Sequence, residues 1–134
     1  MVPSIPSYIR DTKHFLQKLN DLERLPDNAI LVTADVIGLN PHISHEEGLL
    51  SLENALNSKP RPSDAIPAED IVDLAKLVLT NNNLVFSGKH YLQTRGTAIG
   101  TKMAPSYANI FMDKVEREIL VESPAKTLCV VALH

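Results

Sequence analysis

The chain has 134 residues and a mass of 14.8 kDa, a length that accommodates one domain at most. Hydrophobic residues make up 44% and charged residues 22% of the sequence, which is an ordinary globular composition and excludes a fibrous or disordered chain. The formal net charge of -3 lacks the basic excess that phosphate backbones select, and the single cysteine, Cys129, excludes an internal disulfide. A signal peptide and a transmembrane segment are both absent from the sequence, which favours an intracellular location.

The first third of the sequence predicts a helix followed by a strand. Ser7 is a candidate cap for a helix over residues 8–25, because apolar side chains recur there at helical spacing. Residues 29–34 form a short apolar run rich in β-branched side chains, which predicts a buried strand that ends at Asp35. Gly, Asn and Pro over residues 38–41 then predict a loop.

The remaining sequence predicts three more helices and one β-hairpin. The helices are expected over residues 45–57, 67–79 and 104–120, the hairpin over 84–94 and a glycine-containing loop over 95–103. The tail after residue 122 reads as one weak apolar strand. The predicted fold class is therefore α+β, with helices packed on a small, mostly antiparallel sheet.

Two segments of the chain resemble the palm motifs of Penelope-like reverse transcriptases, which are the RNA-directed DNA polymerases of a kind of retrotransposon. Residues 31–39 (LVTADVIGL) and 41–48 (PHISHEEG) are similar to the first motif, and residues 7–16 (SYIRDTKHFL) to its lead-in. Residues 95–105 (RGTAIGTKMAP) and 108–112 (ANIFM) are similar to the second motif.

The resemblance covers roughly residues 7–122 and implies a partial reverse-transcriptase palm. It divides the chain into an N-terminal tail (1–6), a partial reverse-transcriptase domain (7–122) and a divergent C-terminal tail (123–134). The implied activity is nucleotidyl transfer to a primer on an RNA or DNA template, with dNTP as the second substrate. No membrane partner is expected, and surfaces left uncovered by the missing parts of the domain favour self-association.

The resemblance also implies the site residues. Asp35 is expected to be a catalytic aspartate that binds Mg2+, and the backbone carbonyl of Val36 is expected to touch the same metal ions. Gly96, Gly100 and Pro105 are expected to shape a loop that lies against the template and the incoming nucleotide, since a missing side chain lets the backbone come close.

The sequence departs from the family pattern in two ways that bear on activity. Asn40 stands where these enzymes generally place an aromatic residue that blocks the ribose 2′-hydroxyl, so discrimination against ribonucleotides should be weaker. The paired-aspartate motif is absent after the last helix, which leaves the magnesium site incomplete. We therefore expect a truncated fragment that is inactive alone; the alternative is a retained module that binds nucleic acid or protein.

Simpler interpretations of the same residues stay open at this point. Asp35 is also an ordinary turn former, and the glycines of 95–103 also suit a plain helix-entry loop. His42 and His45 have side chains that bind metals, but a lone pair of histidines in a loop is more often a solvated helix entry. A phosphate-binding loop is excluded because Thr101, not glycine, precedes Lys102.

Overall fold

The structure is a computed structural model that describes residues 5–22, 25–30, 32–33, 35–122 and 132–133. Within these residues the chain forms five helices and two two-stranded sheets, so the predicted α+β class is confirmed. The elements in chain order are β1 (Tyr8–Ile9), α1 (Thr12–Asn20), α2 (Leu39–His42), α3 (His45–Asn57), α4 (Ala68–Thr80), β2 (Asn83–Phe86), β3 (Lys89–Leu92), α5 (Ala104–Glu122) and β4 (Ala132–Leu133). Among the described residues, no helix is both long and apolar enough to cross a membrane.

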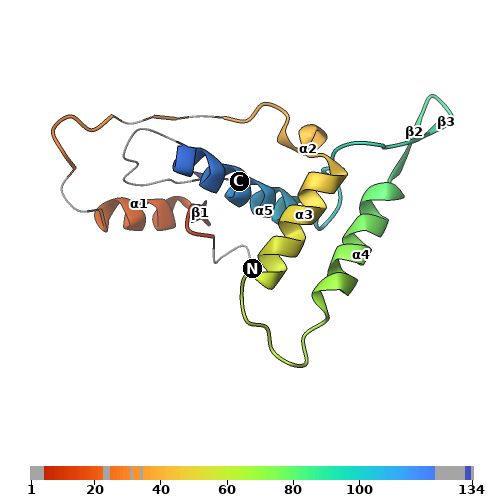
Figure 1. Ribbon diagram of the computed structural model, residues 1–134. Helices are drawn as coiled ribbons and strands as arrows, with labels where there is room; N and C mark the ends of the chain where they lie inside the picture. Colours follow the sequence, from red (N-terminus) through yellow and green to blue (C-terminus); the bar gives the residue numbers. More distant parts are fainter. Residues whose placement is uncertain (1–4, 23–24, 31, 34, 123–131, 134) are drawn as a thin grey trace.

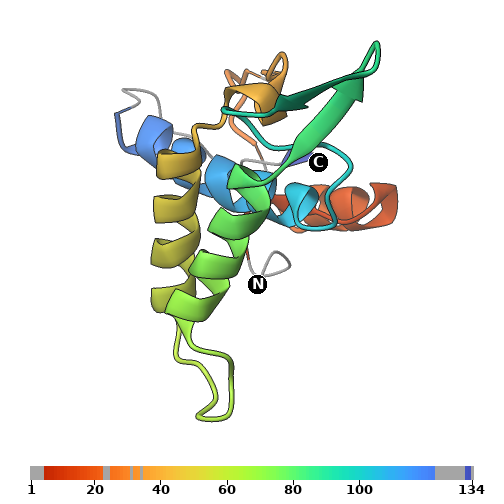
Figure 2. The ribbon, with the colours of Figure 1, turned by 90° about the vertical axis from the view of Figure 1, so that its right-hand side faces the viewer.

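The core lies between helices α3, α4 and α5, with α3 packed against both of the others (Figure 1). Its buried side chains form two neighbouring clusters, one of Ile43, Leu79, Tyr107 and Ala108 and the other of Leu52, Leu56, Ala75 and Ile110. The expectation that helices pack on a sheet is wrong for this core, because its described walls are helices. The β2–β3 hairpin instead stands away from the helices at the end of α4 (Figure 2).

Helix α3 matches its predicted bounds because its local sequence signals agree with one another. The Ser44 hydroxyl accepts a hydrogen bond from the Glu47 backbone N–H at 3.2 Å and donates one to the Glu47 carboxylate at 2.9 Å. Glu46 and Glu47 stand in the first turn, where the helix dipole favours negative charge. Leu52 and Leu56, four residues apart, are buried on one face of the helix.

Helix α4 and the hairpin also form close to where the sequence predicts them. Pro67 is the N-cap residue of α4 and stands one position before the helix, not at the first helical position as expected. The turn between β2 and β3 holds Ser87 at φ 50° and Gly88 at φ 73°. Positive φ at both central residues matches the tight turn that suits the twist of a hairpin.

The N-terminal helix begins later than predicted, and its cap is Asp11 instead of Ser7. The Asp11 carboxylate accepts a hydrogen bond from the His14 backbone N–H at 2.8 Å. This bond, together with the Arg10 guanidinium at 2.9 Å, lowers the pKa of Asp11 below its usual value. Ser7 is buried just before β1, which pairs in parallel with β4. The β1 strand occupies residues 8 and 9, which the sequence places in the helix. Helix α1 itself contains no buried residue.

The strand predicted over residues 29–34 is not formed by the residues that the structure describes there. Ile30 and Val32 have irregular backbone and are 87% and 77% exposed, while Leu31 and Ala34 lie outside the described residues. A strand needs a neighbour to pair its backbone groups, and the described part of the chain places none beside this run. Most of the predicted C-terminal strand, residues 123–131 and 134, lies outside the described residues.

Gly48 sits inside α3, where glycine normally costs about 1 kcal/mol relative to alanine. A methyl group at this position would overlap the ring and hydroxyl of Tyr107 and stand 2.8 Å from Cγ2 of Ile43. We therefore expect Gly48→Ala to lower the free energy of unfolding by about 1–3 kcal/mol, the usual cost of overpacking, measured by urea denaturation. In a Tyr107→Leu background, which removes the overlap with the phenol and leaves only the contact with Ile43, the same substitution should cost clearly less. An equal loss in both backgrounds would contradict the assigned contact.

Candidate functional site

The two segments that resemble polymerase motifs meet where α2 faces the loop before α5. The backbone N–H of Thr97 donates to the carbonyl oxygen of Asn40 at 2.8 Å. Nε2 of His45 lies 2.9 Å from the carbonyl oxygen of Gly96, and because that oxygen only accepts, Nε2 carries the proton. Two parts of the chain that are distant in sequence are thus held together by two hydrogen bonds.

Only glycine fits at position 96, because the backbone of residues 40 and 41 occupies the space that a side chain would take. Its backbone is left-handed, with φ +75°, and a Cβ atom would stand 2.6 Å from Cα of Pro41 and 2.8 Å from the carbonyl oxygen of Asn40. These are backbone atoms, which cannot move aside as a flexible side chain can. The close approach expected of Gly96 is therefore made to the chain's own backbone.

Gly100 and Pro105 differ from Gly96 in their surroundings. Gly100 is exposed, and a Cβ atom there would meet nothing within 4 Å. Pro105 is the second residue of α5 and is exposed, in a first turn where a backbone N–H has no helical partner to lose. Both residues present open surface beside the junction.

The approach to the junction is a left-handed turn followed by a short helix, where the sequence predicted a loop. Gly38 has φ 66° and precedes α2, and Nδ1 of His42 donates to the Gly38 carbonyl oxygen at 2.6 Å. His42 and His45 therefore each use one ring nitrogen to hold backbone. In the part of the chain that the structure describes, no three His, Cys, Asp or Glu side chains are grouped to hold a metal ion.

Asp35 and Val36 lie three and two residues before Gly38, on irregular, exposed backbone. The predicted place of Asp35 at the end of a buried strand is therefore wrong. Among the described residues, no hydrogen bond or ion pair involves the Asp35 side chain, and none joins it to the loop of Gly100. Mg2+ requires about six oxygen ligands and is usually bound by one or two carboxylates with substrate phosphates and water. One exposed carboxylate and one carbonyl do not by themselves form such a site.

Three buried polar atoms lack a hydrogen-bond partner among the described residues: Oδ1 of Asn40, Oγ1 of Thr97 and Oδ1 of Asn109. Each such group costs about 1–3 kcal/mol if it stays unsatisfied. Asn40 and Thr97 are the residues whose backbones join the two motif segments. The junction therefore contains polar atoms suited to an ordered water molecule or to a polar group of a ligand.

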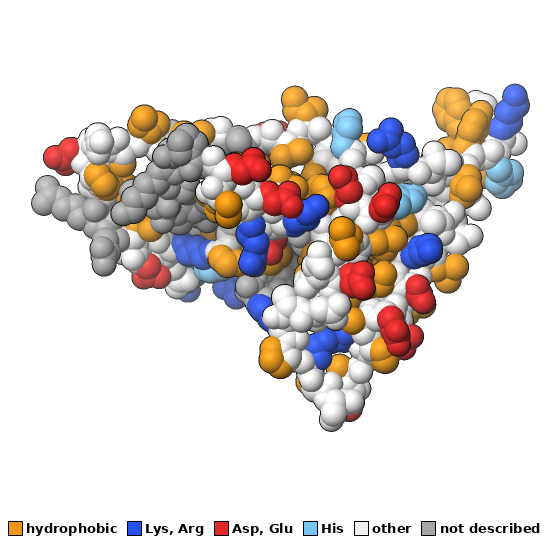
Figure 3. Space-filling view, in the orientation of Figure 1, with side chains coloured by type: hydrophobic (Ala, Val, Ile, Leu, Met, Phe, Trp, Pro, Cys, Tyr) orange, Lys and Arg blue, Asp and Glu red, His pale blue; other side chains and the backbone are white. Residues whose placement is uncertain are grey.

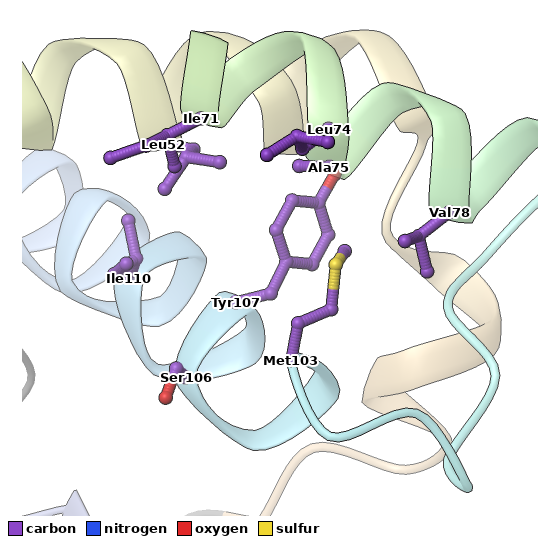
Figure 4. Close-up of a pocket in the computed structure, with 9 residues that line it drawn as sticks. All are labelled: Leu52, Ile71, Leu74, Ala75, Val78, Met103, Ser106, Tyr107 and Ile110. Atoms are coloured by element: carbon purple, nitrogen blue, oxygen red, sulfur yellow. The ribbon is translucent and has the colours of Figure 1, made fainter. Parts of the chain in front are cut away.

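A hollow of about 260 Å³ opens between α3, α4 and α5, away from the junction residues Asn40 and Thr97 (Figure 4). It is lined by Leu52, Ile71, Leu74, Ala75, Val78, Met103, Ser106, Tyr107 and Ile110. The Tyr107 ring extends from α5 into the space between the helices, beside Met103, and its hydroxyl end reaches α3 at Gly48. Because the lining is almost wholly apolar, this hollow suits an apolar side chain and not a phosphate or a metal ion.

Acidic and hydrophobic side chains lie next to one another on the surface over α3 and α4 (Figure 3). Leu74 and Val78, at the edge of the hollow, are 59% and 41% exposed. The acidic side chains over α3 and α4 would repel a phosphate backbone, so this face is poorly suited to binding nucleic acid.

Tyr107 and Thr97 are central to the structure, although the sequence did not single them out. Tyr107 stands four residues before Phe111 and so shares its helix face, a signal that periodicity contains. Thr97 has no comparable signal, because its burial depends on a loop whose path is set by α2. Burial raises the pKa of the Tyr107 phenol to about 12, and its hydroxyl makes only a long contact of 3.5 Å to the carbonyl oxygen of His45.

Comparison with known proteins gives no match: no family model, curated protein or solved structure is significantly similar to this chain.

The two loop glycines form a matched pair for substitution. Gly96→Ala places a methyl group against the Pro41 backbone at positive φ, and we expect a loss of about 2–4 kcal/mol in the free energy of unfolding. Gly100→Ala adds a methyl group in open space, and we expect a change within about 0.5 kcal/mol. Urea denaturation measures both, and hydrogen exchange at the Thr97 amide reports whether its bond to Asn40 is kept. Equal effects at the two positions would show that the junction is not packed as described.

The phenol of Tyr107 should make stability fall at alkaline pH. Its folded pKa of about 12 lies above the ordinary tyrosine value of 10.0, so the folded state disfavours the phenolate. The contribution is therefore fully present below pH 10.0 and is lost as pH rises toward about 12. Ultraviolet titration of the native protein should show one late tyrosine ionisation, near pH 12. Tyr107→Phe should remove this late step, and a late step that persists in the variant would assign it elsewhere.

Proposed function

We propose that this chain is part of an RNA-directed DNA polymerase of the Penelope-like kind, and that the chain alone has no polymerase activity. The observation that supports the proposal is the junction between the two motif-like segments. Their sequence order is that of the first and second palm motifs, and the Thr97–Asn40 hydrogen bond and the close approach of Gly96 to Pro41 bring them side by side.

In this proposal the substrates are a primer on an RNA or DNA template and a dNTP. Asp35 would contribute one carboxylate and Val36 its backbone carbonyl to the metal site, and bound Mg2+ would supply the charge that stabilises the transferred phosphate. Gly100 and Pro105, at the exposed end of the loop, face template and nucleotide. Asn40 and Thr97 offer polar atoms that the described chain leaves without partners.

The inactivity of the isolated chain follows from the number of carboxylates. Transfer with two metal ions needs carboxylates from separate strands, because two cations repel each other strongly unless several anions lie between them. Asp35 offers one carboxylate, on exposed and irregular backbone, and among the described residues its side chain has no hydrogen-bond or ion-pair partner. Positioning and charge stabilisation supply most of the acceleration in this chemistry, so their loss removes most of the rate.

We expect no incorporation of labelled dNTP above background when the purified chain is given a primed RNA or DNA template with Mg2+ or Mn2+. The matched controls are Asp35→Ala and Asp64→Ala, since both aspartates are exposed and only Asp35 belongs to the proposed site. Template-dependent extension that Asp35→Ala abolishes and Asp64→Ala preserves would show that the chain is active, with carboxylates supplied from elsewhere. The claim of inactivity would then be wrong.

The family assignment has a separate test, which restores the missing carboxylates. If the reading frame that follows residue 134 encodes a Tyr-x-Asp-Asp-like strand, the extended protein should extend a primer on an RNA template. Asp35→Ala should then lower the rate about 100-fold or more, and Asp64→Ala should leave it unchanged. An extended protein that carries this strand and stays inactive would contradict the assignment.

A second candidate function is a binding module derived from the same domain. The observation that favours it is the exposed apolar surface of the hollow and of the hairpin, including Leu74, Val78 and Phe86 at 59%, 41% and 68% exposure. Such a surface binds protein through hydrophobic contact, whereas the acidic α3–α4 face disfavours nucleic acid. Salt-dependent binding of the isolated chain to a primer–template would favour nucleic acid over protein as the partner.

A further inference from the structure

The β2–β3 hairpin is a two-stranded sheet whose strands are exposed along their whole length. All eight strand residues are exposed, and five are large and apolar: Leu84, Val85, Phe86, Tyr91 and Leu92. In Figure 3 these hydrophobic atoms form the projecting corner of the molecule, beside a basic side chain and a histidine. An isolated hairpin is marginally stable in water, because it has neither a covered face nor a third strand.

The register of the hairpin shows which backbone N–H and C=O groups of β2 make no hydrogen bond to β3. Phe86 pairs with Lys89 across the two-residue turn, and Asn82 accepts a hydrogen bond from Gln93, so positions 82, 84 and 86 of β2 point their backbone groups toward β3. Asn83 and Val85 alternate with them and point theirs outward. The outer edge of β2 therefore presents the N–H and C=O of Val85 to any strand that lies beside it.

The charges differ between the two edges of the hairpin. Strand β2 has the sequence Asn-Leu-Val-Phe and carries no charge, whereas β3 begins with Lys89 and His90. Two copies of β3 placed edge to edge would bring like charges together, and two copies of β2 would not. The β2 edge is thus the one that accepts a copy of itself.

We propose that β2 is a dimerisation edge, at which two copies of the chain pair antiparallel about a two-fold axis through Val85. The pairing places Val85 opposite Val85 of the partner subunit, Leu84 opposite Phe86 of the partner subunit, and Asn83 opposite Ser87 of the partner subunit. The product is a four-stranded sheet in the order β3, β2, β2, β3, which covers the uncharged edges and leaves Lys89 and His90 on the outer strands. This inference rests on the hairpin alone and does not depend on the proposed polymerase function.

The first test measures the dimer dissociation constant of the whole chain by sedimentation equilibrium. Val85→Pro removes the outward N–H without removing a bond of the hairpin, and Val85→Lys adds a like charge at the two-fold axis. Each should raise the dissociation constant about tenfold or more, because two symmetry-related hydrogen bonds or charges are affected. Val85→Thr keeps both the N–H and the β-branch and should change the constant less than threefold, with far-UV circular dichroism confirming that every variant folds.

The second test uses disulfide trapping, which does not depend on variants that weaken the edge. In a Cys129→Ser background, Val85→Cys should form a covalent dimer on mild oxidation, because facing Cα atoms of paired strands lie about 5.5 Å apart. His90→Cys is the matched control, since the two copies of residue 90 would be three strand spacings, or about 14 Å, apart and should not cross-link.

Three results would overturn the proposal. One is a wild-type chain that stays monomeric at every concentration up to its solubility. Another is a dimer that keeps its affinity in both Val85→Pro and Val85→Lys but is lost in Leu74→Asp, which would place the interface at the hollow between α3, α4 and α5. The third is a covalent dimer from His90→Cys and none from Val85→Cys, which would assign the contact to the other edge of the hairpin.

Discussion

The close approach of α3 and α5 at Gly48 and Tyr107 is the contact on which the rest of the structure depends. With no side chain at Gly48, the Tyr107 ring lies directly against α3 and reaches Ile43, the buried residue between α2 and α3. This contact fixes the start of α3, and with it the position of His45. The His45 ring in turn holds the carbonyl of Gly96. The junction of the two motif-like segments is therefore positioned by packing in the helical core.

Glycine has two different physical roles in the segment from 95 to 103. Gly96 is necessary because the chain's own backbone occupies the space that a side chain would take, whereas Gly100 has open space around it. A sequence comparison alone treats both as glycines that let a ligand come close. The structure attributes one of them to folding, so the argument for a nucleic-acid surface depends on Gly100 and Pro105 more than on Gly96.

The elements that the sequence predicts well are those with local signals. Residues 45–57 combine a capping serine, acids in the first turn and apolar spacing of helical period, and the helix forms with those bounds. The hairpin likewise depends on its Ser-Gly turn. The start of the first helix was misplaced because Ser7 and Asp11 are both good caps, and the choice depends on the pairing of β1 with β4, a contact with residues 132–133. A parallel pairing of such distant residues has no signature in either segment.

The candidate site also combines features set by the local sequence with features set by contacts between distant segments. The junction of Asn40 with Thr97 could not be predicted from spacing, because it needs the packed helices on either side. Asp35 was assigned to a strand from composition, and composition does not supply a neighbouring strand.

The exposed apolar side chains around Asp35 bear on the proposed function. Ile30, Val32 and Ile37 are 87%, 77% and 90% exposed, a pattern that is costly for a segment whose final position is in water. A catalytic carboxylate has to be held within about 0.5 Å of its working position by packed neighbours. In the proposed polymerase, a strand that paired with residues 29–36 would bury these side chains and fix Asp35 at the same time.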